Sequence, residues 1–268
     1  MMSEQDENLS SVAEHNLELA PMEGIDALVF RLAAGRSIIL QKIVPLLAIV
    51  LVLFANIMVF TIVPNEAVMG AVQRIFYYHV GSASSSYLTI FLLFVASVFY
   101  LLGRKTAWDM LAQASAEVSL LLCSIVLVTG MIWGHSAWNV WWRWEPRLVS
   151  FLVLWLILFS YVVMRGFTGH DARFRNFAAV VGIISAVNVP IVIFSIKFLD
   201  QTEQLHPEVV AREGGLSDER FVWALIISIL AIAVTSVWFT TVRFMGLVLA
   251  ERLRRLEDDV LNMEERHA

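Results

Sequence analysis

The residues best suited to chemistry lie together in residues 133–147, which read WGHSAWNVWWRWEPR. This segment holds five of the nine tryptophans of the chain, with two arginines and one glutamate among them. Indole rings stack on other flat π-systems, and guanidinium groups hold carboxylates through charge-assisted hydrogen bonds. The segment is therefore suited to a large planar ligand with acidic substituents. Its candidate binding residues are Trp133, Trp138, Trp141, Trp142, Arg143, Trp144, Glu145 and Arg147.

The spacing within this segment predicts a short helix that leads into the next apolar run. One face of the helix, at i, i+3, i+4 and i+7, would carry Trp138, Trp141, Trp142 and Glu145. The other face would carry Arg143, Trp144 and Arg147. Pro146 suits the first turn of the following helix, where a missing N–H costs nothing. An aromatic belt or an interfacial amphipathic helix is the alternative reading, although a belt scatters its indoles over several helix ends.

Histidines supply the metal ligands that a planar, iron-containing ligand would need. Haem is flat and apolar, carries two carboxylates, and accepts neutral imidazole on its iron. His79 in RIFYYHVGS and His206 in TEQLHPEVV fall on connections expected on the same side as the tryptophans. His135, within the segment, is a third candidate. For each of them, an ordinary loop or interface histidine is the alternative.

The composition places these residues in a membrane protein. Of the 268 residues, 59% are hydrophobic and only 16% are charged, with a mean hydropathy of +0.73, whereas soluble chains carry about 25% charged residues. The net charge of −5 arises mainly at the two ends, and no basic surface for nucleic acid is visible. Cys123 is the only cysteine, which excludes an internal disulfide, a CxxC pair and covalent c-type haem attachment.

Six apolar runs predict an all-α membrane protein with six transmembrane helices, because only helices or closed barrels satisfy the backbone in lipid. The predicted spans are residues 43–63, 80–103, 110–133, 148–166, 177–199 and 221–244. Lysines and arginines number thirteen on one side and six on the other. This bias predicts both termini in the cytoplasm and a tryptophan-rich outer loop between helices three and four.

The same reading divides the chain into three parts. Residues 1–42 form a polar cytoplasmic N-terminal segment, residues 43–244 the six-helix membrane domain, and residues 245–268 a charged cytoplasmic tail. The tail carries apolar residues at helical spacing, so a helix that extends span six is expected there.

Three stretches resemble one family of haem-handling membrane proteins. The tryptophan spacing, with VTG before it and PRL after it, is similar to the family's tryptophan-rich "WWD" signature. RIFYYHV at residues 74–80 resembles the first histidine motif of the CcmC haem chaperones of cytochrome c maturation. VNVPIVIFS at residues 187–195 resembles the start of their fifth span. With six spans and matching sidedness, the resemblance covers residues 40–245.

This resemblance implies a protein that binds haem b, non-covalently and transiently, on the periplasmic face of the cell inner membrane. It implies delivery of that haem to a membrane-anchored periplasmic haem chaperone, with ABC transporter subunits as further partners. At the matching positions, His79 is the first axial iron ligand, and the five tryptophans form the stacking surface. His206 is the candidate for the second axial ligand. Such a protein is not an enzyme.

The sequence departs from the family pattern at three positions. Glu145 stands where the signature has aspartate, and Asn139 stands where glycine is expected. His206 comes three residues later than the second family histidine, and Glu203 occupies the expected offset. A loop absorbs such an insertion at small entropic cost, so His206 is retained as the second ligand.

Two other classes of function remain open. A secondary transporter would need polar groups near the middle of the bilayer or broken helices. The candidates for this role are Asn56, Glu117, Asn188 and Pro190. Glu117 is the strongest of these candidates, because an acidic residue inside a membrane span is energetically costly and usually functional. A cofactor-free assembly subunit would instead use its indoles as contacts with a partner protein.

Overall fold

Six long helices make up most of the structure. The computed structural model describes residues 39–66, 69–168, 172–198 and 218–267. The long helices are α3 (Val44–Ile57), α4 (Ile75–Gly103), α5 (Thr106–Trp138), α6 (Pro146–Thr168), α7 (Ala172–Phe194) and α8 (Glu219–His267). Short turns of other helix types adjoin them, namely η1 (Ile39–Ile43), η2 (Met58–Ile62), η3 (Ala71–Arg74) and η4 (Ser195–Phe198).

Each of the six helical stretches is long and apolar enough to cross a membrane, so the predicted all-α fold with six spans is confirmed. The chain is a multi-pass membrane protein. Helices suit lipid because every interior backbone N–H and C=O is paired within the segment. α5 has 33 residues, and at 1.5 Å per residue it reaches about 50 Å, more than the roughly 30 Å of hydrocarbon. Its ends therefore project beyond the apolar layer.

Two differences from the predicted spans concern the tryptophan-rich side. The second span was predicted from residue 80, but α4 begins at Ile75, so His79 lies within a helix and not in a connection. The third span was predicted to end at Trp133, but α5 continues to Trp138. Hydropathy detects only the apolar part of a helix, whereas backbone hydrogen bonding continues until a residue ends it.

The charged tail continues the last helix, as predicted. α8 extends past residue 244 to His267 without a break. His206 and residues 1–38 of the predicted N-terminal segment lie outside the described residues.

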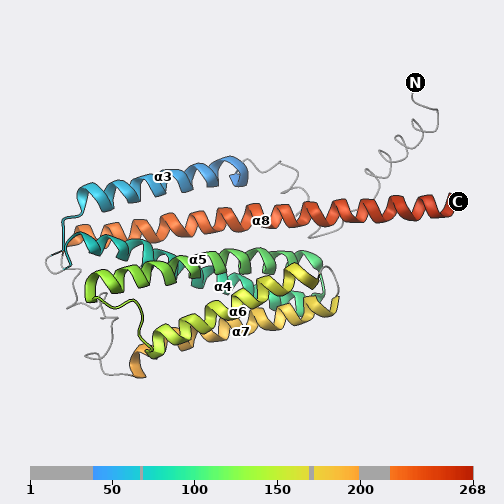
Figure 1. The fold of residues 1–268 in the computed structure, drawn as a ribbon. Coiled ribbons are helices and arrows are strands. Elements are labelled where there is room, and N and C mark those ends of the chain that lie inside the picture. Colours follow the sequence, from blue (N-terminus) through green and yellow to red (C-terminus); the bar gives the residue numbers. More distant parts are fainter. Residues whose placement is uncertain (1–38, 67–68, 169–171, 199–217, 268) are drawn as a thin grey trace.

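α4 and α5 occupy the centre of the bundle (Figure 1). α3 and α8 lie side by side on one side of this pair, and α6 and α7 lie on the other (Figure 1). α4 packs against α5, α7 and α8, and α6 packs against α5 and α7. At the left of Figure 1, α5 ends and α6 begins. We call this the tryptophan end of the bundle.

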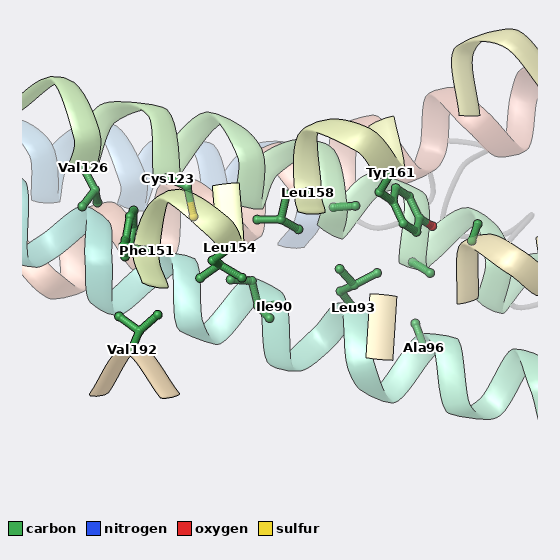
Figure 2. Close-up of a cluster of buried hydrophobic side chains, with 13 residues drawn as sticks. Ile90, Leu93, Ala96, Cys123, Val126, Phe151, Leu154, Leu158, Tyr161 and Val192 are labelled. Carbon is green, nitrogen blue, oxygen red and sulfur yellow. The ribbon is translucent and has the colours of Figure 1, made fainter. Parts of the chain in front are cut away.

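A cluster of buried hydrophobic side chains joins α4, α5, α6 and α7 (Figure 2). Figure 2 shows Val126 and Phe151 toward one end of the cluster and Tyr161 at the other. Beside it, the Ser119 hydroxyl of α5 donates to Thr89 Oγ1 of α4 over 2.8 Å. Small polar residues of this kind let transmembrane helices approach closely and bond to each other. The central helices are therefore held together by both packing and hydrogen bonds.

Charged side chains join three helices at the end of the bundle opposite the tryptophans. Asp109 near the start of α5 is buried, and Arg165 of α6 donates from Nη2 to its Oδ2 over 2.9 Å. Nε of Arg175 on α7 lies 3.7 Å from the same carboxylate oxygen. A buried carboxylate is tolerated because cations surround it.

The same network extends along α5 to α8. Gln113 accepts from Arg165 over 2.6 Å and donates to Glu117 Oε1 over 3.1 Å. Arg243 of α8 donates from Nη2 to Glu117 Oε1 over 2.9 Å. This ion pair gives Glu117 a structural role. We call the six linked residues the ionic cluster: Asp109, Gln113, Glu117, Arg165, Arg175 and Arg243.

Candidate functional site

The tryptophan segment is not the single helix that its spacing predicts. α5 ends at Trp138, and Asn139 adopts the left-handed conformation with φ 56°. The Asn139 N–H donates to the His135 carbonyl over 2.9 Å, which ends the helix. Glycine and asparagine tolerate this backbone best. This backbone accommodates asparagine as well as the glycine that the resemblance led us to expect at this position.

The chain then turns back against the last turn of α5. The Val140 N–H lies 3.4 Å from the Gly134 carbonyl, and a Cβ at Gly134 would lie only 2.9 Å from the Val140 oxygen. Glycine is therefore required for this close approach. α6 begins at Pro146 as predicted, and the Glu145 carbonyl accepts from the Val149 N–H over 3.0 Å.

A cavity opens between this turn and the helices α4, α5 and α6. About 750 Å³ of space that no atom fills lies within its outline, and this figure includes open solvent at its mouth. Its polar and aromatic lining residues are His79, Tyr87, Trp133, Trp138, Trp141, Trp142 and Arg147. Its floor includes Val126 and Phe151 of the hydrophobic cluster in Figure 2. The cavity thus reaches from the tryptophan end into the bundle.

His79 projects into this cavity from α4. Its Nδ1 lies 3.1 Å from the Thr129 hydroxyl oxygen of α5. Its ring meets the Trp133 indole edge-on, with 5.8 Å between centroids and 64° between planes. The imidazole is therefore held between two helices at the wall of the cavity.

Trp133 forms a buried part of the same wall. Only 5% of its surface is exposed, and its ring contacts Phe76 edge-on at 5.8 Å and Trp138 at 5.7 Å. The indole N–H groups of Trp133 and Trp142 are buried and have no hydrogen-bond partner among the described residues. Buried donors without partners cost free energy, so both are available to an acceptor on a ligand.

His135 lies behind the cavity wall. Its imidazole stacks on Trp141, with 4.1 Å between ring centroids and an angle of 7°. Trp141 lines the cavity and His135 does not. In this arrangement His135 supports an aromatic wall residue, and it is not placed as an iron ligand.

Three of the predicted binding residues do not line the cavity. Trp144 is 78% exposed and meets Trp142 edge-on at 5.8 Å. Arg143 is exposed, and Glu145 is buried at the start of α6. The prediction grouped them with the others because they belong to one tryptophan-rich segment that resembles the family signature. Arg147, in the first turn of α6, lines the cavity, whereas Arg143, in the connection before α6, does not.

Several residues around His79 were not predicted from the sequence. Ala83 and Tyr87 follow His79 at i+4 and i+8 on α4 and line the cavity, as does Gly130 of α5. Thr129 of α5 contacts His79 without lining the cavity. The helical repeat from His79 was the signal that could have found the α4 residues. Thr129 and Gly130 were noted only as part of the VTG that precedes the tryptophans.

Known proteins share these segments. The family model described as "CcmC: Heme exporter protein C" matches residues 30–259, which include the whole cavity lining. The chain belongs to the heme exporter protein C family. The resemblance inferred from three motifs is thereby confirmed.

Individual relatives cover different shares of the chain. Heme exporter protein C of Bradyrhizobium diazoefficiens is 28% identical over 219 residues, which are 81% of this chain and 82% of that protein. The protein of that name from Rhodobacter capsulatus is 34% identical over 105 residues, 39% and 43% of the two chains. The one from Escherichia coli (strain K12) is 32% identical over 146 residues, 54% and 59% of the two chains.

Proposed function

We propose that this chain binds haem in the cavity at the tryptophan end and delivers it during cytochrome c maturation. The observation that carries the proposal is the composition of one cavity. It brings together an imidazole, four indoles and a guanidinium, from His79, Trp133, Trp138, Trp141, Trp142 and Arg147. Family membership independently supports haem as the cargo.

Each group in the cavity has a counterpart on haem. Indoles contact a flat π-system by offset or edge-on packing, and Arg147 would hold a propionate by charge-assisted hydrogen bonds. The indole N–H groups of Trp133 and Trp142 would gain an acceptor. His79 would ligate the iron. Binding is non-covalent, as for haem b, because Cys123 is buried in the hydrophobic cluster and offers no attachment.

The exposure of the cavity suits a cargo that is passed on. Trp138 and Trp141 are 38% and 57% exposed, so one edge of a bound porphyrin would remain accessible. We place this edge on the periplasmic side of the inner membrane, with both termini in the cytoplasm. A membrane-anchored haem chaperone would receive the haem there, with ABC transporter subunits as further partners. His206, outside the described residues, is the proposed second ligand, and the chain itself performs no catalysis.

A haem titration of the purified protein tests the proposal. The wild type is expected to develop a Soret band that saturates at one haem per chain. His79→Ala should lose most of this binding, and His206→Ala should weaken it and alter the spectrum. His135→Ala is the comparison for iron ligation: it should keep the position of the wild-type Soret band, because this histidine does not line the cavity. A wild type that takes up no haem, or a His79→Ala variant that binds as the wild type does, would refute the assignment.

A further inference from the structure

The hydroxyl of Thr129 determines which nitrogen of His79 carries the proton. Thr129 Oγ1 lies 2.6 Å from the Ile125 carbonyl and 3.3 Å from the Val126 carbonyl, and carbonyls only accept. The single hydroxyl proton is therefore directed toward the backbone of α5. At 3.1 Å from His79 Nδ1, the oxygen must accept, so the proton of this contact belongs to Nδ1.

We propose that Thr129 is a positioning residue, which holds His79 as the Nδ1–H tautomer and presents the Nε2 lone pair to the iron of haem. The inference rests on the proposed function for its ligand, but the tautomer itself follows from the contacts of the protein. Thr129 reaches His79 from a different helix, so the bond also fixes α4 against α5.

The tautomer matters because iron binds a nitrogen that carries no proton. Metal-binding histidines usually donate their other ring N–H to a neighbouring acceptor, which fixes the ring and raises its basicity. A neutral hydroxyl polarises the imidazole less than a carboxylate would. His79 is therefore an oriented ligand of moderate donor strength, which suits a cargo that must be released.

Gly130, the neighbour of Thr129 on α5, lies against the same edge of the imidazole. A Cβ on Gly130 would lie 3.0 Å from His79 Cε1 and 3.5 Å from Nδ1. The backbone of α5 thus passes directly against the edge of the imidazole. Thr129 supplies the hydrogen bond, and the neighbouring glycine leaves the room that this geometry needs.

The first test compares Thr129→Val with Thr129→Ser in haem titrations. Valine keeps the shape of threonine but removes the acceptor, so haem affinity should fall about tenfold. The reduction potential of bound haem should rise, because a less basic imidazole stabilises ferric iron less. Serine keeps the hydroxyl and should restore both the affinity and the potential. If Thr129→Val matches the wild type in both measurements while His79→Ala does not, the positioning role is overturned.

The second test needs no haem. In ¹⁵N spectra of histidine-labelled protein in lipid bilayers, the His79 signals are those missing from His79→Asn. The wild type and Thr129→Ser should show protonated Nδ1 and unprotonated Nε2, and Thr129→Val should shift toward the other tautomer. A proton on Nε2 in the wild type would overturn the inference. A wild type with the expected tautomer that binds no haem would instead refute the proposed function.

Discussion

The two ends of the helical bundle use charge in opposite ways. At the end opposite the tryptophans, Asp109 is buried beside Arg165 and Arg175, and the charges of the ionic cluster face each other. At the tryptophan end, Arg147 lines a cavity, and no described carboxylate lies within ion-pair distance of it. At one end opposite charges face each other, whereas at the other a guanidinium and two indole N–H groups border a cavity.

This difference separates the groups that hold the fold from those that await a ligand. Removing one partner of a buried ion pair is costly because the other charge is left uncompensated, so the ionic cluster ties α5, α6, α7 and α8 together. At the tryptophan end, the Trp133 and Trp142 N–H groups lack partners among the described residues. Substitutions at the first end should therefore affect stability, and those at the second should affect haem binding.

The largest expected effect is on stability, from Asp109→Ala. The variant leaves Arg165 and Arg175 buried without their carboxylate, which should cost about 3–5 kcal/mol. Thermal unfolding of the purified protein should show a melting temperature lower by about 10 °C. Asp258→Ala is the control, since it removes an exposed pair with Arg254 on α8 and should leave the melting temperature unchanged. Equal losses of melting temperature in both variants would show that the buried ion pairs of the ionic cluster stabilise the fold no more than an exposed pair does.

Arg147→Ala should have the next largest effect, and it should be on binding. The variant loses the charge-assisted hydrogen bond between the guanidinium and a haem propionate. A loss of about 1.4 kcal/mol in binding free energy weakens haem binding about tenfold. Arg143→Ala is the matched control, because it removes an arginine from the same segment that does not line the cavity. The titration should show Arg143→Ala within about twofold of the wild type. A larger loss for Arg143→Ala than for Arg147→Ala would contradict the assigned cavity lining.

Two tryptophans of the segment allow the same comparison between a lining residue and an exposed one, with a smaller expected effect on haem binding. Trp141 lines the cavity, whereas Trp144 is 78% exposed and does not. Trp141→Ala should therefore weaken haem binding about fivefold, through loss of an aromatic contact. Trp144→Ala should change the dissociation constant little. Identical losses in the two variants would indicate that all five indoles contact the ligand together.

The smallest expected effect concerns the turn that closes the cavity. Asn139 has a positive φ, which alanine adopts less readily than asparagine or glycine. Asn139→Ala should lower the melting temperature by about 2 °C, and Asn139→Gly should retain the wild-type value. Thermal unfolding of both variants checks this, and a more stable alanine variant would contradict the assigned turn.

The number and type of helices were predictable from the sequence because lipid permits few alternatives for the backbone. The helix ends were less predictable. Hydropathy placed the start of the second span at residue 80, yet α4 begins at Ile75 and carries His79. Polar and aromatic residues can continue a helix beyond the apolar layer, and composition alone does not show where such a helix stops.

The candidate site was predictable in its chemistry more than in its geometry. Residue types alone singled out His79, the tryptophans and Arg147, but the spacing suggested a helix where Asn139 ends one. Thr129 was not predicted as a functional residue. A threonine within an apolar run ordinarily bonds to its own helix, and its contact with His79 depends on how α4 packs against α5.

Imidazole rescue of a His79→Gly variant tests the central claim most directly. Glycine removes the ligand and leaves space beside Gly130 and Trp133, where free imidazole can enter. We predict that the purified variant binds haem weakly and with an altered Soret band, and that added imidazole restores the wild-type spectrum. A variant with the wild-type spectrum before imidazole is added would show that His79 does not ligate haem.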